Sequence, residues 1–127
     1  MKKLLLLLLL IPNLVMGDYE LLINVSDDSF ESTVFIDRST IKEINGKRRV
    51  LFYSNMEGFV SNVSAGKVSV KEYIEYDCKR EISLTLSTIT YPKSNLEGSP
   101  SRIPKNYQEE HIIPNTVQAA VFNAVCR

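Results

Sequence analysis

Apolar and polar side chains alternate along most of the chain after residue 18. Such alternation is typical of β-strands that bury one face, because successive side chains point to opposite sides of a sheet. In the segment 67–79, apolar side chains and Cys78 share one face, which only Glu72 interrupts, and mostly charged side chains share the other. The pattern predicts strands at residues 19–25, 30–37, 41–44, 47–55, 67–79 and 81–91, and a short extended piece at 110–113.

Within the first of these strands, Tyr19, Leu21, Ile23 and Val25 are expected on one face. Turn residues separate the later strands. The segment 37–40 (DRST) predicts the end of a strand, since Asp and Ser side chains bond to nearby backbone.

Three further segments are predicted to connect the strands. The pair Asn45-Gly46 is the strongest short signal for a hairpin. Residues 57–66, rich in Gly, Ser and Asn, are predicted to be flexible. Residues 92–105 contain three prolines and are predicted to form a loop.

The end of the chain has the features of a helix. Asn115 is the predicted N-cap, with Gln118 three residues later in a capping-box arrangement. Pro114 cannot extend the helix backwards. An apolar stripe follows at helical spacing, formed by Val117, Ala120, Val121, Ala124 and Val125.

The first 17 residues have the features of a secretory signal peptide. Two lysines follow Met1, an apolar run extends from Leu4 to Ile11, and small residues lie near a cut predicted after Gly17. The apolar run is too short to cross a bilayer as a helix, which needs about 20 residues. The sequence therefore predicts export to the periplasm or the outer cell surface, with no membrane span in the mature chain.

Export changes the meaning of the two cysteines. In an oxidising compartment Cys78 and Cys126 are expected to form a disulfide. The chain-entropy treatment gives such a bridge, closing a loop of roughly 50 residues, about 4 kcal/mol of stability. The bridge would fasten the final helix to the long strand that ends near Cys78.

Length and charge limit the remaining possibilities. The 110 residues after the predicted cut form one domain, 18–127. They carry 13 Lys and Arg against 15 Asp and Glu, a net charge of about −2, which gives no reason to expect a nucleic-acid partner. The predicted fold is α+β: an antiparallel sheet of about five strands with the C-terminal helix packed on it and one disulfide.

The sequence offers little catalytic chemistry. His111 is the only histidine and has no evident nucleophile beside it, so a surface histidine is favoured over a general base. Paired carboxylates such as Glu75 and Asp77 share their strand face with lysines, which indicates a solvated mixed-charge face. We expect no enzyme activity, no cofactor and no metal site, and a hydrolase is the least favoured class.

The densest basic cluster is the candidate binding surface. It follows the predicted Asn-Gly turn and extends to basic residues before it. These side chains suit acidic partners or glycans, but ordinary solubilising charge explains them as well, because strand geometry divides neighbouring residues between two faces. The cluster comprises Arg38, Lys42, Lys47, Arg48 and Arg49.

Four stretches in succession resemble elements of the surface-adhesin protein E family. Residues 34–41 (VFIDRSTI) resemble its strand followed by Asp-x-Ser-x-Ile, and residues 45–50 (NGKRRV) its basic hairpin return strand. Residues 75–80 (EYDCKR) resemble its Asp-Cys element with a following Arg, and residues 114–126 its final helix ending in Cys. The resemblance implies a PAS-like fold and an adhesin of Gram-negative bacteria that binds host extracellular-matrix or plasma proteins.

Three functions follow as hypotheses. The favoured one is an exported, non-enzymatic binding module, in its adhesin form directed at host matrix or plasma proteins. The second is a periplasmic accessory or small-ligand-sensing domain of PAS-like fold. The third is a secreted enzyme inhibitor that presents the loop 92–105. A homodimer is one arrangement that the sequence permits.

Overall fold

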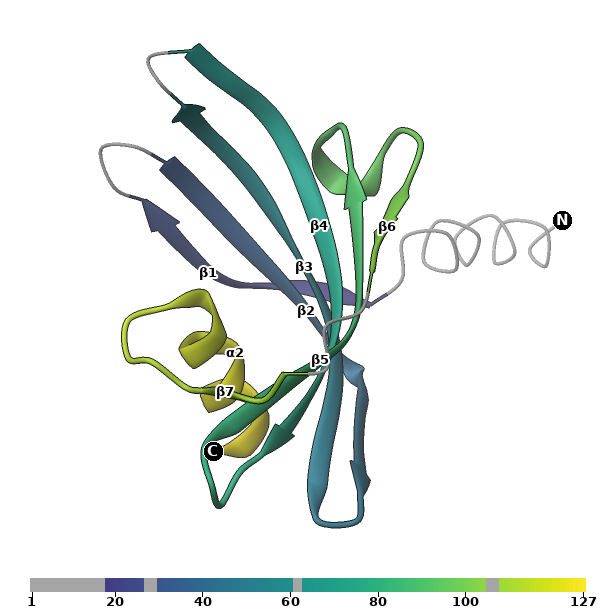
Figure 1. Ribbon diagram of the computed structural model, residues 1–127, viewed down its shortest axis with the longest axis vertical. Coiled ribbons are helices and arrows are strands. Elements are labelled where there is room, and N and C mark those ends of the chain that lie inside the picture. Colours follow the sequence, from purple (N-terminus) through teal and green to yellow (C-terminus); the bar gives the residue numbers. More distant parts are fainter. Residues whose placement is uncertain (1–17, 27–29, 61–62, 105–107) are drawn as a thin grey trace, which may run out of the picture.

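The computed structural model describes residues 18–26, 30–60, 63–104 and 108–127. The predicted signal peptide and its cut after Gly17 lie outside these residues. The described part consists of one twisted antiparallel sheet, one α-helix and one short 3-10 helix (Figure 1). The sheet has seven strands: β1 (Tyr19–Ser26), β2 (Phe30–Ile44), β3 (Lys47–Val60), β4 (Val63–Asp77), β5 (Ile82–Tyr91), β6 (Ser101–Ile103) and β7 (Glu110–His111).

The strand order follows the chain from β1 to β6, and β7 also pairs with β5. The prediction of about five strands was therefore too low. The segment 92–105 is not a simple loop, because it holds a short 3-10 helix, η1 (Ser94–Leu96), and β6. Both short strands pair with β5: β6 pairs with Thr88–Thr90, and β7 pairs with Ile82–Ser83. Strands of two or three residues leave almost no alternation in a sequence, so this pairing had no readable signal.

The long hairpins combine confirmed and corrected predictions. Asn45 and Gly46 form the predicted turn between β2 and β3, with φ of 52° and 79°. Two successive positive φ values are typical of a type I′ turn, whose twist matches the twist of the two strands that it joins. By contrast, the prediction of a flexible segment 57–66 was wrong, since β3 continues to Val60 and β4 begins at Val63. Backbone pairing with β2 and β4 extends the ladder there despite the Gly-rich composition.

The strand β2 passes through the predicted turn at 37–40 without ending. The pairing with β3 is irregular there, since Asp37 faces Leu51 and Lys42 faces Arg49. An Asp37 side-chain oxygen accepts hydrogen bonds from the backbone and side chain of Ser39, as the turn signal requires. Thr40 Oγ1 accepts from the Leu51 amide at 2.9 Å. The threonine side chain thus replaces part of the interrupted ladder, and the strand resumes.

A bulge divides the predicted face of β1. The register shifts between Leu21 and Ile23, so that Leu21 lies opposite Phe35 and Ile23 opposite Val34. Because directly paired residues share a face, Leu21 and Ile23 point to opposite sides of the sheet. The prediction of a single apolar face on β1 was wrong: Leu21 is 64% exposed, whereas Leu22 packs against the core.

The core lies between one sheet face and the helix α2 (Val117–Cys126). The helix crosses β1, β2 and β3 on this face, with which it makes its main contacts. The sheet contributes Val34, Ile36, Val50, Phe52, Ile74 and Tyr76, all fully buried, and the helix contributes Val121, Phe122 and Val125. The opposite sheet face is not covered by an α-helix in the described part of the chain (Figure 1).

The helix begins one residue later than predicted. Its N-cap is Thr116, whose Oγ1 accepts from the Ala119 amide at 3.1 Å, while Asn115 adopts a φ of 64°. The Gln118 side chain does not form a capping box but accepts a hydrogen bond from the Tyr76 hydroxyl at 2.8 Å. At the other end, Cys126 is joined to Cys78 directly after β4, as expected.

Replacing Thr116 with Ala is expected to lower the free energy of unfolding by about 1 kcal/mol, because the Ala119 amide loses its cap. Thr116→Ser keeps an acceptor and should change it by less than about 0.5 kcal/mol. Asn115→Gly should be neutral or slightly stabilising, since Gly adopts this φ without strain. Chemical denaturation of the three variants measures the differences. Equal losses for the Ala and Ser variants would contradict this assignment of the cap.

Candidate binding surface

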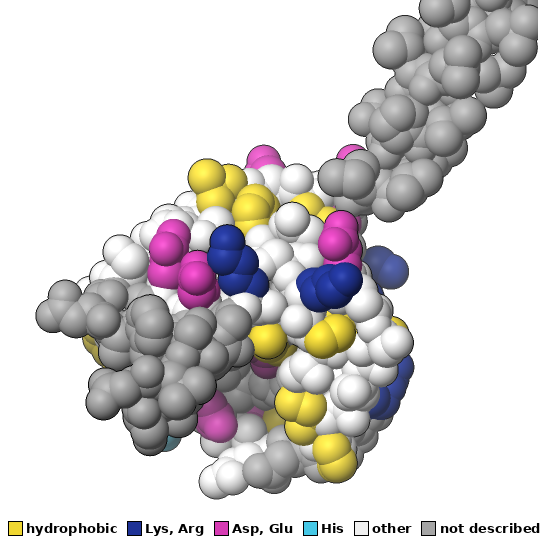
Figure 2. Space-filling view, turned by 90° about the horizontal axis from the view of Figure 1, so that it is seen from above, with side chains coloured by type: hydrophobic (Ala, Val, Ile, Leu, Met, Phe, Trp, Pro, Cys, Tyr) yellow, Lys and Arg dark blue, Asp and Glu magenta, His cyan; other side chains and the backbone are white. Residues whose placement is uncertain are grey.

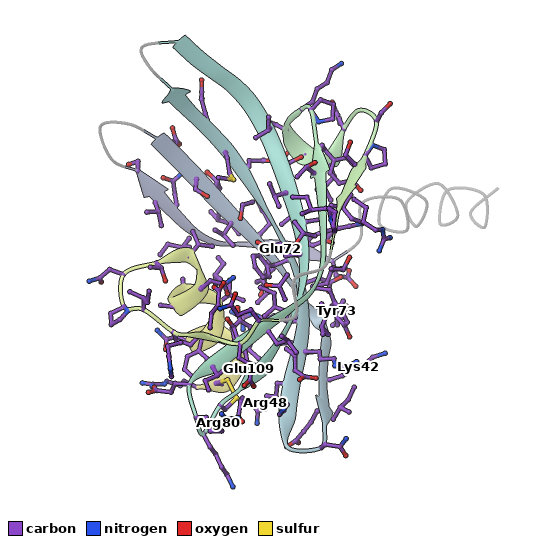
Figure 3. All side chains as sticks on the ribbon, viewed as in Figure 1. Lys42, Arg48, Glu72, Tyr73, Arg80 and Glu109 are labelled. Atoms are coloured by element: carbon purple, nitrogen blue, oxygen red, sulfur yellow. A yellow bond between two sulfur atoms is a disulfide. The ribbon has the colours of Figure 1, made fainter. Side chains whose placement is uncertain are left out.

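The structure divides the predicted basic cluster between the two sheet faces. Arg48 points to the helix side and Arg49 to the opposite side, as adjacent strand residues must. Figure 3 shows Arg48 next to α2, whereas Lys42 lies on the other side of the sheet. The cluster therefore does not form one continuous patch.

Two of its arginines hold the end of the helix. Arg48 donates to the Val125 carbonyl at 2.7 Å, and Arg38 donates to the Ala124 carbonyl at 3.3 Å. Carbonyls in the last turn of a helix lack intrahelical partners and carry the negative end of its dipole, so cations there are stabilising. Arg38 also forms an ion pair with Glu20 of β1. These contacts explain both arginines by the packing of α2.

The other three basic residues lie on the sheet face opposite α2. Arg49 Nε contacts Glu75 at 2.9 Å and Lys47 Nζ contacts the same carboxylate at 3.8 Å. The hydrogen bond with Glu75 is the main cause that raises the pKa of Arg49. Lys42 is opposite Arg49 in the register, is exposed, and forms no ion pair with any described residue. Lys42, Lys47 and Arg49 are called the basic strip below.

Aromatic side chains occupy the same face further along the sheet. The register aligns Leu21, Phe35 and Tyr53 across β1, β2 and β3. The Phe35 and Tyr53 rings stack with centroids 4.9 Å apart, and Tyr19 meets Tyr53 edge-on at 4.8 Å. Burial, with smaller effects from Asp37 and two tyrosines, raises the pKa of Tyr19 to about 12. Tyr53 follows the buried Phe52 in β3 and therefore points to the other face, but only the register shows its alignment with Phe35 and Leu21.

The segment around η1 is bonded to this face as well. Asn55 and Asn95 exchange two hydrogen bonds of 2.8 Å, one of them from the Asn95 amide. Ser69 Oγ donates to the Lys93 carbonyl at 2.6 Å and accepts from the Leu96 amide at 3.0 Å. The region that the inhibitor hypothesis would present to an enzyme is thus fastened to β3 and β4.

An acidic cavity lies on the helix side, near the β5 edge. It measures about 180 Å³ and is lined by carboxylates of Glu72 and Glu110, with Thr88, Ile103 and Gln108. Burial raises the pKa of Glu72, the nearby Glu110 adds to the rise, and a hydrogen bond with Thr88 opposes it. Glu72 points to the helix side and its neighbour Tyr73 to the other (Figure 3). The sequence showed only that Glu72 interrupts an apolar face.

The remaining candidate, His111, is exposed on β7 and lies opposite Ile82 in the register. The preceding segment is held by Arg80, which contacts Glu109 at 3.6 Å and Asp77 at 3.8 Å. Viewed from above, acidic and basic side chains lie next to one another among hydrophobic ones on the described surface (Figure 2). This mixture agrees with the formal charge balance of the chain.

Fold and surface together define a small α+β domain in which a disulfide fastens a C-terminal helix to an antiparallel sheet. A sequence model of the family described as surface-adhesin protein E matches residues 22–127, which is most of the chain. The chain therefore belongs to the surface-adhesin protein E family. No helix among the described residues is long and apolar enough to span a bilayer.

Solved structures show the same fold. Protein E of Haemophilus influenzae aligns with a TM-score of 0.57 at 15% identity, covering 87% of this chain and 84% of that chain. A second crystal form of that protein gives 0.59 at 15% identity, with 87% of each chain covered. Protein E from non-typeable Haemophilus influenzae gives 0.55 at 13% identity, covering 87% and 76%. A search of curated protein sequences gave no match.

Proposed function

We propose that this chain is an exported, non-enzymatic binding module that attaches to host extracellular-matrix or plasma proteins. The observation that carries the proposal is the family match over residues 22–127, supported by the fold shared with protein E. Within the proposal, the signal peptide 1–17 directs export and is cut after Gly17. The proposal also places the mature protein at the outer cell surface rather than in the periplasm.

The basic strip is proposed as part of the contact surface. Lys42 is exposed and Lys47 is only loosely paired with Glu75, so both lysines remain accessible to an acidic partner. Arg38 and Arg48 are left out, because their contacts with the end of α2 give them a structural role. Four other predictions have no contact in the structure that favours them. They are the PAS-like description of the sheet, the small-ligand-sensing function, the enzyme-inhibitor function and the homodimer.

We expect the protein, expressed as residues 1–127 and purified after export, to bind at least one of vitronectin, laminin and plasminogen saturably. The double variant Lys42→Ser, Lys47→Ser should weaken this binding by about 3- to 10-fold, because rim charges contribute modestly and mainly to association. Raising the salt concentration should weaken it in the same direction. Surface plasmon resonance measures both effects.

The matched control is Lys79→Ser, Lys93→Ser, which removes two exposed lysines elsewhere on the molecule. Absence of saturable binding to all three host proteins would reject the adhesin function. Equal weakening by both double variants would reject the basic strip as a specific contact. Digestion by protease added to intact cells decides the location, since a periplasmic protein is protected.

A further inference from the structure

The outermost strand β1 has one unpaired edge. It pairs with β2 along seven of its eight positions, and no other described strand pairs with it. Natural edge strands are usually protected from further pairing by Lys, Pro, a bulge or an inward-pointing charge. In β1 the bulge at Leu22 and the charge of Glu20, which shares the helix-side face of Ile36, protect only the first half of the strand. The second half, Ile23–Ser26, has no Lys, Pro, charge or bulge. An unprotected edge of this kind accepts another extended strand.

A groove runs beside this edge, between β1 and α2, which lie next to each other in Figure 1. Its volume is about 380 Å³. The bulge in β1 turns Ile23, which is 37% exposed, and Val25 towards the helix, where they form one wall. The other wall consists of small or neutral residues just before α2 and along its first two turns: Asn115, Thr116, Ala119, Ala120 and Asn123.

We propose that an uncharged, extended peptide segment of a partner protein binds here as an additional strand on β1. Its backbone pairs with the free edge, and alternate side chains enter the groove. The charge of the site selects this occupant: among the described residues, none that lines the groove is ionisable, so a charged side chain would lose its hydration without gaining a counter-charge from them. The alanines of α2 leave room for side chains of valine or threonine size. The inference rests on the proposed protein-binding function and specifies its mode.

A matched pair of substitutions on β1 isolates the groove from the strand. Ile23→Ser removes apolar area from the groove wall, whereas Leu21→Ser removes a more exposed apolar side chain from the opposite face. Ala120→Phe fills the groove from the helix side without changing β1. Formation of the disulfide and the unfolding midpoint show whether each variant has folded. If Ala120→Phe does not fold, Ile23→Ser replaces it as the variant with an altered groove.

The test selects phage-displayed random linear peptides of about twelve residues, roughly 40 Å when extended, on the exported wild-type protein, with counter-selection on Ala120→Phe. We expect enrichment of uncharged peptides that alternate apolar and small polar residues. Ala120→Phe or Ile23→Ser should weaken an enriched peptide about tenfold or more, and Leu21→Ser less than about twofold. Amide shifts of the isotope-labelled protein should concentrate in β1 and the first half of α2.

Failure to enrich any peptide over the counter-selected variant would overturn the inference, as would shifts located elsewhere. Neither result depends on the host-protein panel. Binding to a host protein that is unaffected by Ala120→Phe and Ile23→Ser would leave the adhesin function standing and reject this mode. Peptide binding without any host-protein binding would reject the adhesin function and keep the groove.

Discussion

Replacing Cys78 and Cys126 with Ala should lower the free energy of unfolding by about 4 kcal/mol. The bridge joins residues 48 positions apart, and the chain-entropy treatment assigns a loop of that length a stabilisation of this size. It connects the end of β4 to the last residue of α2, a helix of ten residues that would be marginal in isolation. Loss of the bridge therefore acts on the element that covers the core.

Guanidinium denaturation of the exported protein, with and without a thiol reductant, measures this effect. Reduction of the wild-type protein should reproduce the loss, and reductant should have no effect on the double Ala variant. A loss below about 1 kcal/mol would show that the unfolded chain is barely constrained by the bridge. Helix content measured by circular dichroism at intermediate denaturant should fall first in the reduced protein, because α2 is then held by packing alone.

Phe122→Ala should cost a comparable amount, about 3 to 5 kcal/mol. Phe122 is 2% exposed and is the largest side chain that α2 places in the core. Its ring meets the fully buried Tyr76 ring edge-on at a centroid distance of 5.8 Å. Truncation removes this contact and leaves a cavity between helix and sheet.

The matched control is the next residue, Asn123, which is exposed on the same helix. Asn123→Ala should change the free energy of unfolding by no more than about 0.5 kcal/mol. Equal losses for the two variants, measured by urea denaturation, would mean that the helix contributes through its backbone rather than through Phe122. A loss below about 1 kcal/mol for Phe122→Ala would contradict the placement of its ring in the core.

Several structural features could be predicted from the sequence because their causes are local. The alternation of β4 and β5 identified both strands, and Asn45-Gly46 located a turn whose φ values only a few residue types adopt readily. The pairing of Cys78 with Cys126 followed from export and from the number of cysteines. The helix followed from its apolar spacing, although its cap was misplaced by one residue.

The candidate surfaces could not be predicted in the same way. The basic cluster is contiguous in sequence, yet the register sends Arg48 to the helix end and Arg49 to Glu75 on the other face. The groove beside β1 depends on a bulge at Leu22, and no local signal in an alternating apolar strand marks a bulge. A shift of one residue exchanges the two faces, so a small error in register changes which side chains a partner meets.

The sequence by itself determined the strands with long alternation, the main hairpin turn, the terminal helix and the disulfide, because each depends on neighbouring residues or on a single covalent pair. The tertiary structure decided the strand β6, the pairing of β6 and β7 with β5, the division of the basic residues and the groove between β1 and α2. These depend on pairing between segments far apart in the chain, where each backbone hydrogen bond is the same whatever the side chain. Side-chain type therefore carries little information about them until the register is known.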